Sequence, residues 1–237
     1  MRILELAVIL PTYNESRNIR DLILAIERLK FDSLILVIDD SSPDGTQDII
    51  RGLQRDFNNI MLVVRSCKMG LGTAIRDGFR ILVSLADRPA YVITMDADFS
   101  HDPADMPRLL QYAMRGYGVV VGSRYVEGGA IVGWPPIRVV ISKIANRLAR
   151  ALIRLPVRDF TSGFRCYSMR YILLALPRLR SRGFEIQVET LRLAQLLGVR
   201  MAEAPITFVN RKLGRSKLGV KEIISFLAYL MRAIFMR

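Results

Sequence analysis

The first half of the chain alternates short apolar runs with longer segments in which apolar residues recur at helical spacing. The runs are rich in Val, Ile and Leu, which is typical of buried strands, and predict strands over Leu4–Leu10, Leu34–Ile38, Ile60–Val64, Tyr91–Met95 and Gly118–Gly122. The longer segments predict helices over Asn14–Leu29, Thr46–Asp56, Leu71–Ala86 and Pro103–Arg115. This alternation predicts an α/β fold, in which helices cover both faces of a mostly parallel central sheet.

The second half of the chain is less regular, but it contains no linker or low-complexity segment. Its pattern predicts helices at about Ile137–Leu155 and near Phe184–Leu197, a short strand over Met201–Phe208, and an apolar helix that runs to the C-terminus. We therefore expect one α/β domain over residues 1–215, followed by an apolar C-terminal helix over residues 216–237.

The charge of the chain narrows the classes of partner. Its 237 residues suffice for one large domain, and 35 Lys and Arg against 22 Asp and Glu give a net charge of +13. This excess favours nucleic acid, an anionic lipid or a phosphorylated substrate. Cys67 and Cys166 form no disulfide framework, which favours a reducing compartment. No signal peptide and no run of about twenty uncharged apolar residues is found, so no membrane-spanning helix is predicted.

Polar and acidic segments follow four of the predicted strands. In chain order these segments read PTYNE, DDSSPDGT, DADFSHD and GSRY. Because parallel sheets bind their ligands at the carboxyl ends of the strands, we expect the four segments to meet in one site.

The segment after the fourth strand is a candidate metal site. Asp96 and Asp98 flank the small Ala97, a spacing that directs both carboxylates to one side of an extended chain. Such hard oxygen ligands suit Mg²⁺ or Mn²⁺, which leave open positions for diphosphate oxygens. An ordinary acidic turn is the alternative, and the neighbouring acidic segments favour the metal. His101, the only histidine of the chain, precedes a predicted helix and is expected to be structural.

Two further carboxylates lie at the expected site. Asp40 ends an apolar strand, where its side chain can accept hydrogen bonds from a base or a ribose. Glu15 is similarly placed, but it can equally belong to the first turn of a helix, where the helix macrodipole favours a negative charge.

Six segments together resemble a known family: VILPTYNE, VIDDSSPDGT, GLGTAIRDGF, MDADFSHDP, VVGSRYVEGG and RSKLG. From about Leu6 to Glu222 the chain is similar to family 2 glycosyltransferases of the GT-A fold, and within them to the dolichol-phosphate mannose synthase group. SPDGT, SRYVEGG and the terminal SKLG are the segments more specific to polyprenyl-phosphate sugar transferases. The resemblance implies transfer of mannose from GDP-mannose to dolichyl or another polyprenyl phosphate, with inversion and with Mg²⁺ or Mn²⁺.

The resemblance also implies a role for each matching residue. The nucleotide would be held by Pro11, Tyr13, Glu15, Ile38 and Asp40. Metal and donor diphosphate would be bound by Asp96, Asp98 and Ser100, the last in place of the Gln of many relatives, and Ala97 would touch the nucleotide through its backbone. Arg124 would contact phosphate near the point of transfer, and Arg138 and Ser142 would bind the acceptor phosphate. Arg211 or Arg215, with Lys217, would close over the donor diphosphate.

The chemistry agrees with this set of residues. A phosphate acceptor is already an anionic nucleophile, so it needs no strong general base, and a candidate base is hard to find in this chain. The reaction instead needs positioned anions and a neutralised leaving diphosphate, which a divalent ion on Asp98 with Arg124 and Arg138 would provide. Transfer of glucose from UDP-glucose and a non-catalytic subunit that binds nucleotide sugars are alternatives. A nucleic-acid-binding protein is disfavoured, because no stacking aromatic residues interleave the basic stretches.

Two segments predict contact with a membrane surface. One sector of the helix at Ile137–Leu155 carries Lys143, Arg147, Arg150 and Arg154, opposite Ile141, Ile144, Ala145, Leu148 and Leu152. This pattern is expected at an anionic membrane, and equally in a surface helix whose apolar face packs on the core. The C-terminal helix is apolar nearly all round and would lie in the membrane interface or pack on a membrane-anchoring partner. We therefore expect a peripheral protein on the cytoplasmic face of the membrane.

Overall fold

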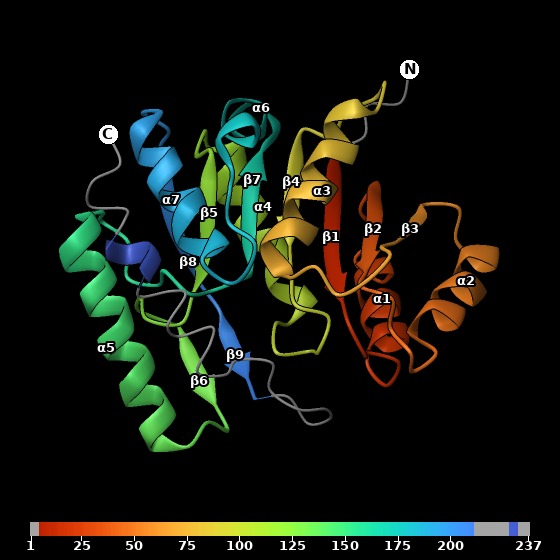
Figure 1. The fold of residues 1–237 in the computed structure, drawn as a ribbon, viewed down its shortest axis with the longest axis horizontal. Helices are drawn as coiled ribbons and strands as arrows, with labels where there is room; N and C mark the ends of the chain where they lie inside the picture. The colour runs from red at the N-terminus through yellow and green to blue at the C-terminus, as the bar shows by residue number, and fades with distance from the viewer. Residues whose placement is uncertain (1–4, 211–227, 232–237) are drawn as a thin grey trace.

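The computed structural model describes residues 5–210 and 228–231, which form a central sheet between layers of helices (Figure 1). The sheet has seven strands in the order β3–β2–β1–β4–β7–β5–β8. Their bounds are β1 Leu6–Thr12, β2 Ser33–Asp39, β3 Ile60–Val64, β4 Tyr91–Thr94, β5 Val119–Ser123, β7 Arg165–Ser168 and β8 Met201–Pro205. All pairings are parallel except the two that β7 makes. The expected single α/β domain with a mostly parallel sheet is confirmed.

Helices cover both faces of the sheet because alternate strand residues point to opposite sides. In β1, Ala7 and Ile9 enter a buried cluster with α3, α5, α6 and α7, whereas Leu6, Val8 and Leu10 enter a second cluster with α1, α2 and α4. The helix bounds are α1 Ile19–Glu27, α2 Thr46–Asp56, α3 Leu71–Ser84, α4 Met106–Met114, α5 Pro136–Ile153, α6 Met169–Ala175 and α7 Ile186–Leu196. Two short 3₁₀ turns are η1 Pro103–Asp105 and η2 Leu176–Arg178.

The chain leaves the main sheet at Ile206, where one continuous strand was expected. The expectation of a strand over Met201–Phe208 was wrong, because the backbone N–H of Ile206 donates to Ser123 O at 3.1 Å while its carbonyl accepts from Ala130 N at 3.0 Å. The residues that follow form β9, Thr207–Val209, which pairs in parallel with β6, Ala130–Val132. This second, two-stranded sheet was not predicted.

Residues 228–231 continue the domain at its C-terminal side. They are helical, and Leu230 is buried in the cluster that contains α3, α5, α6 and α7. This turn therefore packs on the domain. The rest of the expected helix over residues 216–237, and the expected boundary at residue 215, lie outside the described residues. Within the part of the chain that the structure describes, none of the helices combines the length and the apolarity that crossing a bilayer requires.

Candidate active site

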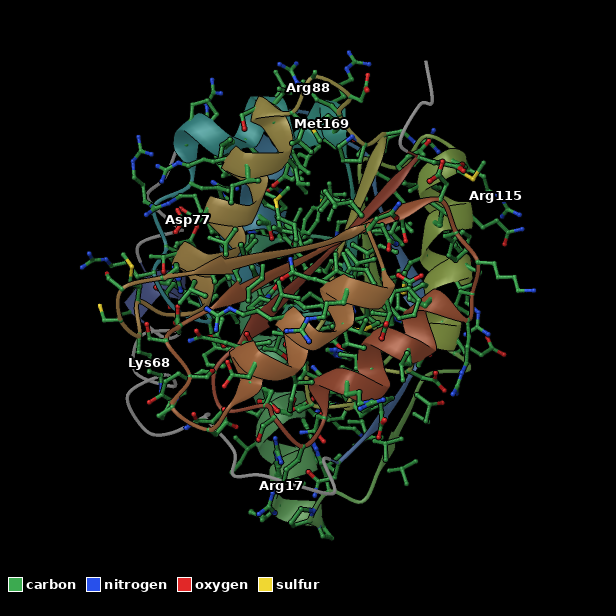
Figure 2. The ribbon with its side chains drawn as sticks, turned by 90° about the vertical axis from the view of Figure 1, so that its right-hand side faces the viewer. Arg17, Lys68, Asp77, Arg88, Arg115 and Met169 are labelled. Carbon is green, nitrogen blue, oxygen red and sulfur yellow. The ribbon has the colours of Figure 1, made fainter. Side chains whose placement is uncertain are left out.

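The carboxyl ends of the parallel strands meet at one edge of the sheet, as predicted. The segments after β1, β2, β4 and β5 begin there, because these four strands run in the same direction. Figure 2 shows Arg17, after β1, and Lys68, after β3, toward this end of the molecule, with Arg88 and Met169 toward the other end. The antiparallel β7 begins at the same edge, so residues 159–163, which precede it, join the site.

The acidic turn after β4 presents the oxygen ligands expected of a divalent metal site. Asp98 is 5% exposed and its Oδ1 accepts a hydrogen bond from the backbone N–H of Ser100 at 3.0 Å. Phe99, between them, has a left-handed φ of 59°, which non-glycine residues seldom adopt. Ser100 is 1% exposed and its Oγ has no hydrogen-bond partner among the described residues.

Two carboxylates and an unpartnered buried hydroxyl fit a hard cation such as Mg²⁺ or Mn²⁺. The side chain of Asp96 is 38% exposed, so it faces the open side of the turn where a ligand can approach. No cluster of three or more His, Cys, Asp or Glu side chains suited to a metal occurs in residues 5–210 or 228–231. An ion held by Asp96, Asp98 and Ser100 therefore needs its remaining ligands from the substrate or water.

His101 has the structural role expected of it. It is 1% exposed, stacks on Phe164 and meets Phe208 edge-on, with ring centroids 5.1 Å and 5.3 Å away. Burial lowers the pKa of the imidazole below 6.5, against the opposing effect of the Asp96 charge. The Nδ1 of the neutral ring accepts a hydrogen bond from the backbone N–H of Asp96 at 3.3 Å. His101 therefore holds the acidic turn in place and is not available as a base.

The residues expected to hold the nucleotide are only partly available to a ligand. Asp40 forms a buried ion pair with Arg65, and its Oδ2 accepts from the backbone N–H groups of Met69 and Gly70 at 3.1 and 3.3 Å. Ile38 is fully buried, so only its backbone can contact a nucleotide. The carboxyl group of Asp40 thus organises the segment before α3, a role that was not predicted.

Two of the residues expected to hold the nucleotide, at the end of β1, keep exposed side-chain surface. Tyr13 is partly exposed and carries the Nζ of Lys68 4.4 Å from its ring centroid, a cation–π contact that the sequence did not suggest. Pro11 is also partly exposed. Glu15 is 6% exposed and accepts from Asn18 Nδ2 at 2.9 Å. It precedes α1, which begins at Ile19, so the alternative that placed it in the first turn of a helix was wrong.

Arg124, after β5, is bound to an acid that sequence reasoning missed. Its Nε and Nη2 donate to the two carboxylate oxygens of Asp159, both at 2.7 Å, and Nη2 also donates to Thr161 Oγ1 at 2.7 Å. Asp159 is fully buried. Burial alone would raise the pKa of Asp159, but the charge and hydrogen bonds of Arg124 lower it below 3.8. The pair therefore stays ionised and fixes the segment before β7 to the end of β5.

The expected acceptor residues on α5 lie beside this ion pair. The guanidinium of Arg138 lies 4.0 Å from the ring centroid of Trp134, and that of Arg124 lies 5.4 Å from the same ring. Ser142 Oγ accepts a hydrogen bond from Tyr125 OH at 2.7 Å. The structure thus brings together Arg124, Arg138 and Ser142, whereas Arg211 and Lys217 lie outside the described residues.

Comparison with known proteins assigns the chain to a family. Residues 7–173 match the family described as Glycosyl transferase family 2. The chain belongs to this family. The resemblance read from the sequence is confirmed, and so is the enzyme class, a glycosyltransferase.

Named relatives cover nearly all of this family 2 glycosyltransferase. It is 40% identical over 224 residues to undecaprenyl-phosphate mannosyltransferase of Micrococcus luteus, covering 92% of this chain and 88% of that one. It is 36% identical over 218 residues to polyprenol monophosphomannose synthase of Mycolicibacterium smegmatis, covering 91% and 82%.

A solved structure shares the fold of this glycosyltransferase. Glucosyl-3-phosphoglycerate synthase from Mycobacterium tuberculosis, in complex with Mn²⁺, UDP-glucose and phosphoglyceric acid, aligns with a TM-score of 0.70 at 19% identity. The alignment covers 98% of this chain and 80% of that one. At this identity the likeness shows the fold, and it confirms the GT-A type of architecture.

Proposed function

We propose that this glycosyltransferase transfers mannose from GDP-mannose to a polyprenyl phosphate such as dolichyl phosphate, with inversion at the anomeric carbon. The observation that carries the proposal is that the acidic turn at Asp96–Ser100 shares one sheet edge with two arginines that flank Trp134. The names of the two curated relatives support mannose as the sugar and a polyprenyl phosphate as the acceptor.

The acidic turn suits the donor half of the reaction. Asp96, Asp98 and Ser100 would hold a Mg²⁺ or Mn²⁺ ion, which supplies the positive charge that a departing diphosphate needs. Tyr13 and Lys68 present a ring and a cation on which the nucleotide can rest. The expected closure of Arg211 and Lys217 over the diphosphate belongs to this proposal.

The arginine side suits the acceptor half. Because Asp159 takes the Nε and Nη2 of Arg124, we assign the remaining Nη1 to the acceptor phosphate, beside Arg138 and Ser142. A phosphate oxygen attacks the anomeric carbon from the face opposite the diphosphate. The new C–O bond forms as the bond to the diphosphate breaks, which inverts the configuration. The attacking oxygen is already anionic, so the reaction does not require His101 or another residue to act as a general base.

The outer surface of α5 supports attachment to a membrane. Its inward face packs through Asn146, Ala149 and Ile153. The apolar residues opposite the basic row are divided: Ala145 and Leu152 pack partly on the core, whereas Ile141, Ile144 and Leu148 are 52%, 57% and 40% exposed.

The four basic residues Lys143, Arg147, Arg150 and Arg154 are also exposed and lie along one side of this apolar stripe. A helix with an apolar stripe next to a basic row matches an anionic lipid surface. We propose that α5 lies on the cytoplasmic face of the membrane, which brings the acceptor headgroup to Arg138.

A donor screen tests the proposed function. Purified protein is incubated with polyprenyl phosphate, Mg²⁺ or Mn²⁺, and GDP-mannose, UDP-glucose or UDP-N-acetylglucosamine, and lipid-linked sugar is measured. The proposal expects product with GDP-mannose and none after chelation of the metal. Product with UDP-glucose alone supports the glucosyltransferase alternative, and no product with any donor supports a non-catalytic subunit.

A further inference from the structure

Gln187, in the first turn of α7, is a buried polar residue with an unused hydrogen-bonding atom. It is 2% exposed, and its amide oxygen Oε1 has no hydrogen-bond partner among the described residues. Buried polar groups are nearly always paired, because an unpaired one loses its hydration without compensation. An unpartnered amide oxygen beside the candidate active site therefore suggests that a ligand supplies the missing hydrogen-bond donor.

The amide lies against the acidic turn. A Cβ built on Gly163 would stand 3.1 Å from Asp96 Oδ1 and 3.5 Å from Gln187 Nε2, so the carboxylate and the nitrogen end of the amide lie over the same glycine. The unpartnered Oε1 is the other polar atom of this amide. The carbonyl of Gly163 is held by Thr94 Oγ1 at 2.9 Å, at the end of β4. A side chain at Gly163 would displace the carboxylate or the amide, so this glycine keeps the space beside Asp96 clear.

The backbone of Gln187 is rigidly mounted. Its carbonyl accepts hydrogen bonds from Nη1 of Arg165 and from Thr190 Oγ1. Arg165 is fully buried, and its other hydrogen bonds fix the carbonyls of Phe160 and Ser162, in the segment that also holds Arg124. The backbone from which the amide extends is therefore held in a fixed place relative to this edge of the sheet.

A carboxylate next to a neutral amide matches sugar hydroxyls better than any other part of the donor. A carboxylate only accepts hydrogen bonds, whereas an amide both donates and accepts, so the pair can hold two neighbouring hydroxyl groups. In the proposed site the donor diphosphate is held through the divalent ion and the acceptor phosphate by Arg124 and Arg138, so neither needs the neutral amide of Gln187. The sugar is the uncharged, hydroxyl-rich part of the donor that adjoins the diphosphate.

We infer that the Gln187 carboxamide binds a hydroxyl group of the donor sugar beside Asp96, and so contributes to the choice of sugar. This inference rests on the proposed function and adds a residue to it that the sequence motifs did not reveal.

The test separates the sugar from the nucleotide. Gln187→Met keeps the unbranched shape and removes both polar atoms. With Mn²⁺ present, calorimetry measures the dissociation constants of GDP-mannose and of GDP for wild type, for Gln187→Met and for Gln111→Met, a control at an exposed glutamine on α4. In Gln187→Met the dissociation constant of GDP-mannose, divided by that of GDP, should rise at least about tenfold, whereas in Gln111→Met this ratio should stay at the wild-type value. The dissociation constant of GDP itself should stay within about twofold of wild type in both variants.

Thermal stability distinguishes a binding role from a structural one. Oε1 has no hydrogen-bond partner among the described residues, so only the Nε2 donor is lost to the fold, and the melting temperature of Gln187→Met should fall by no more than about 2–4 °C. If that variant is not obtained folded, Gln187→Asn replaces it, because Asn keeps the amide but is one methylene shorter. The same rise in the ratio of the two dissociation constants is expected for Gln187→Asn.

The outcomes are distinguishable. An unchanged ratio of the two dissociation constants overturns the inference, whether or not the melting temperature falls, and leaves the proposed function standing. Failure of the wild type to bind GDP-mannose overturns both.

Discussion

Replacing Asp159 by Asn tests the buried ion pair that fixes the arginine side of the site. The carboxylate accepts hydrogen bonds from three groups of Arg124 (N, Nε and Nη2), from the N–H and hydroxyl of Thr161, and from the N–H of Ser162. Asn has a single acceptor oxygen. Whichever carboxylate oxygen the amide nitrogen replaces, it faces at least two N–H donors, and the charge of Arg124 loses its partner.

The magnitude follows from the burial of the pair. Arg124 and Asp159 are 7% and 0% exposed, and breaking a buried pair from one side typically costs about 3–5 kcal/mol. For a protein of 150–250 residues each kcal/mol lowers the melting temperature by about 2–4 °C, so we expect a fall of roughly 6–20 °C.

Thermal or denaturant unfolding measures this fall. The matched control is Asp48→Asn, which breaks an exposed ion pair with Arg51 at 3.2 Å and should change stability by less than about 1 kcal/mol. If Asp159→Asn is no less stable than Asp48→Asn, the pair does not have the energetic role assigned to it here.

The difference in stability between wild type and Asp159→Asn should also depend on pH, in a direction set by the lowered pKa of Asp159. Because the folded pKa of Asp159 is below the ordinary value of 3.8, the unfolded chain takes up a proton first as the pH falls. The stability that the pair contributes is therefore complete above that value and is lost as the pH falls through the folded pKa. Since Asn does not titrate, the stability difference between wild type and Asp159→Asn should shrink below about pH 4.

Two further substitutions separate the acceptor and membrane roles. Arg138→Ala should raise the KM for polyprenyl phosphate roughly 10- to 150-fold, the equivalent of about 1.5–3 kcal/mol for a charge-assisted contact, with the KM for GDP-mannose little changed; equal losses for both substrates would contradict an acceptor-specific role. Ile141→Glu combined with Ile144→Glu should lower binding to anionic vesicles in sedimentation at least about tenfold, because each apolar side chain buried in lipid is worth about 1.5–3 kcal/mol. Leu174→Glu, at an exposed apolar position on α6, is the control and should bind normally, so equal vesicle binding by both variants would argue against α5 as the lipid-facing helix.

Most of the parallel part of the fold could be predicted from the sequence. The bounds of α2 and β3 were predicted to the residue, because a turn and a change of hydrophobic period mark both ends. By contrast β7 is only four residues long and starts with Arg165, whose burial depends on carbonyl groups supplied by Phe160, Ser162 and Gln187. Nothing in the local sequence signals that such an arginine belongs in a core.

The candidate site also has a part that could be predicted from the sequence and a part that could not. The acidic turn was predictable because Asp96 and Asp98 are close in sequence and follow a clear strand. The partners of Arg124 and Asp40 were not, because Asp159 and Arg65 lie 35 and 25 residues away in the chain. Such pairs exist only once the strands have been brought to a common edge.

The most direct test of the account asks whether the acceptor phosphate is the nucleophile. Polyprenyl phosphate and the matching polyprenol, which lacks the phosphate, are each incubated with GDP-mannose, Mn²⁺ and either wild-type protein or Asp98→Ala, and mannosyl lipid is measured. The account predicts product from polyprenyl phosphate with wild-type protein only, and none from polyprenol. Comparable transfer to polyprenol would contradict it, because a hydroxyl acceptor requires a base that His101 cannot supply.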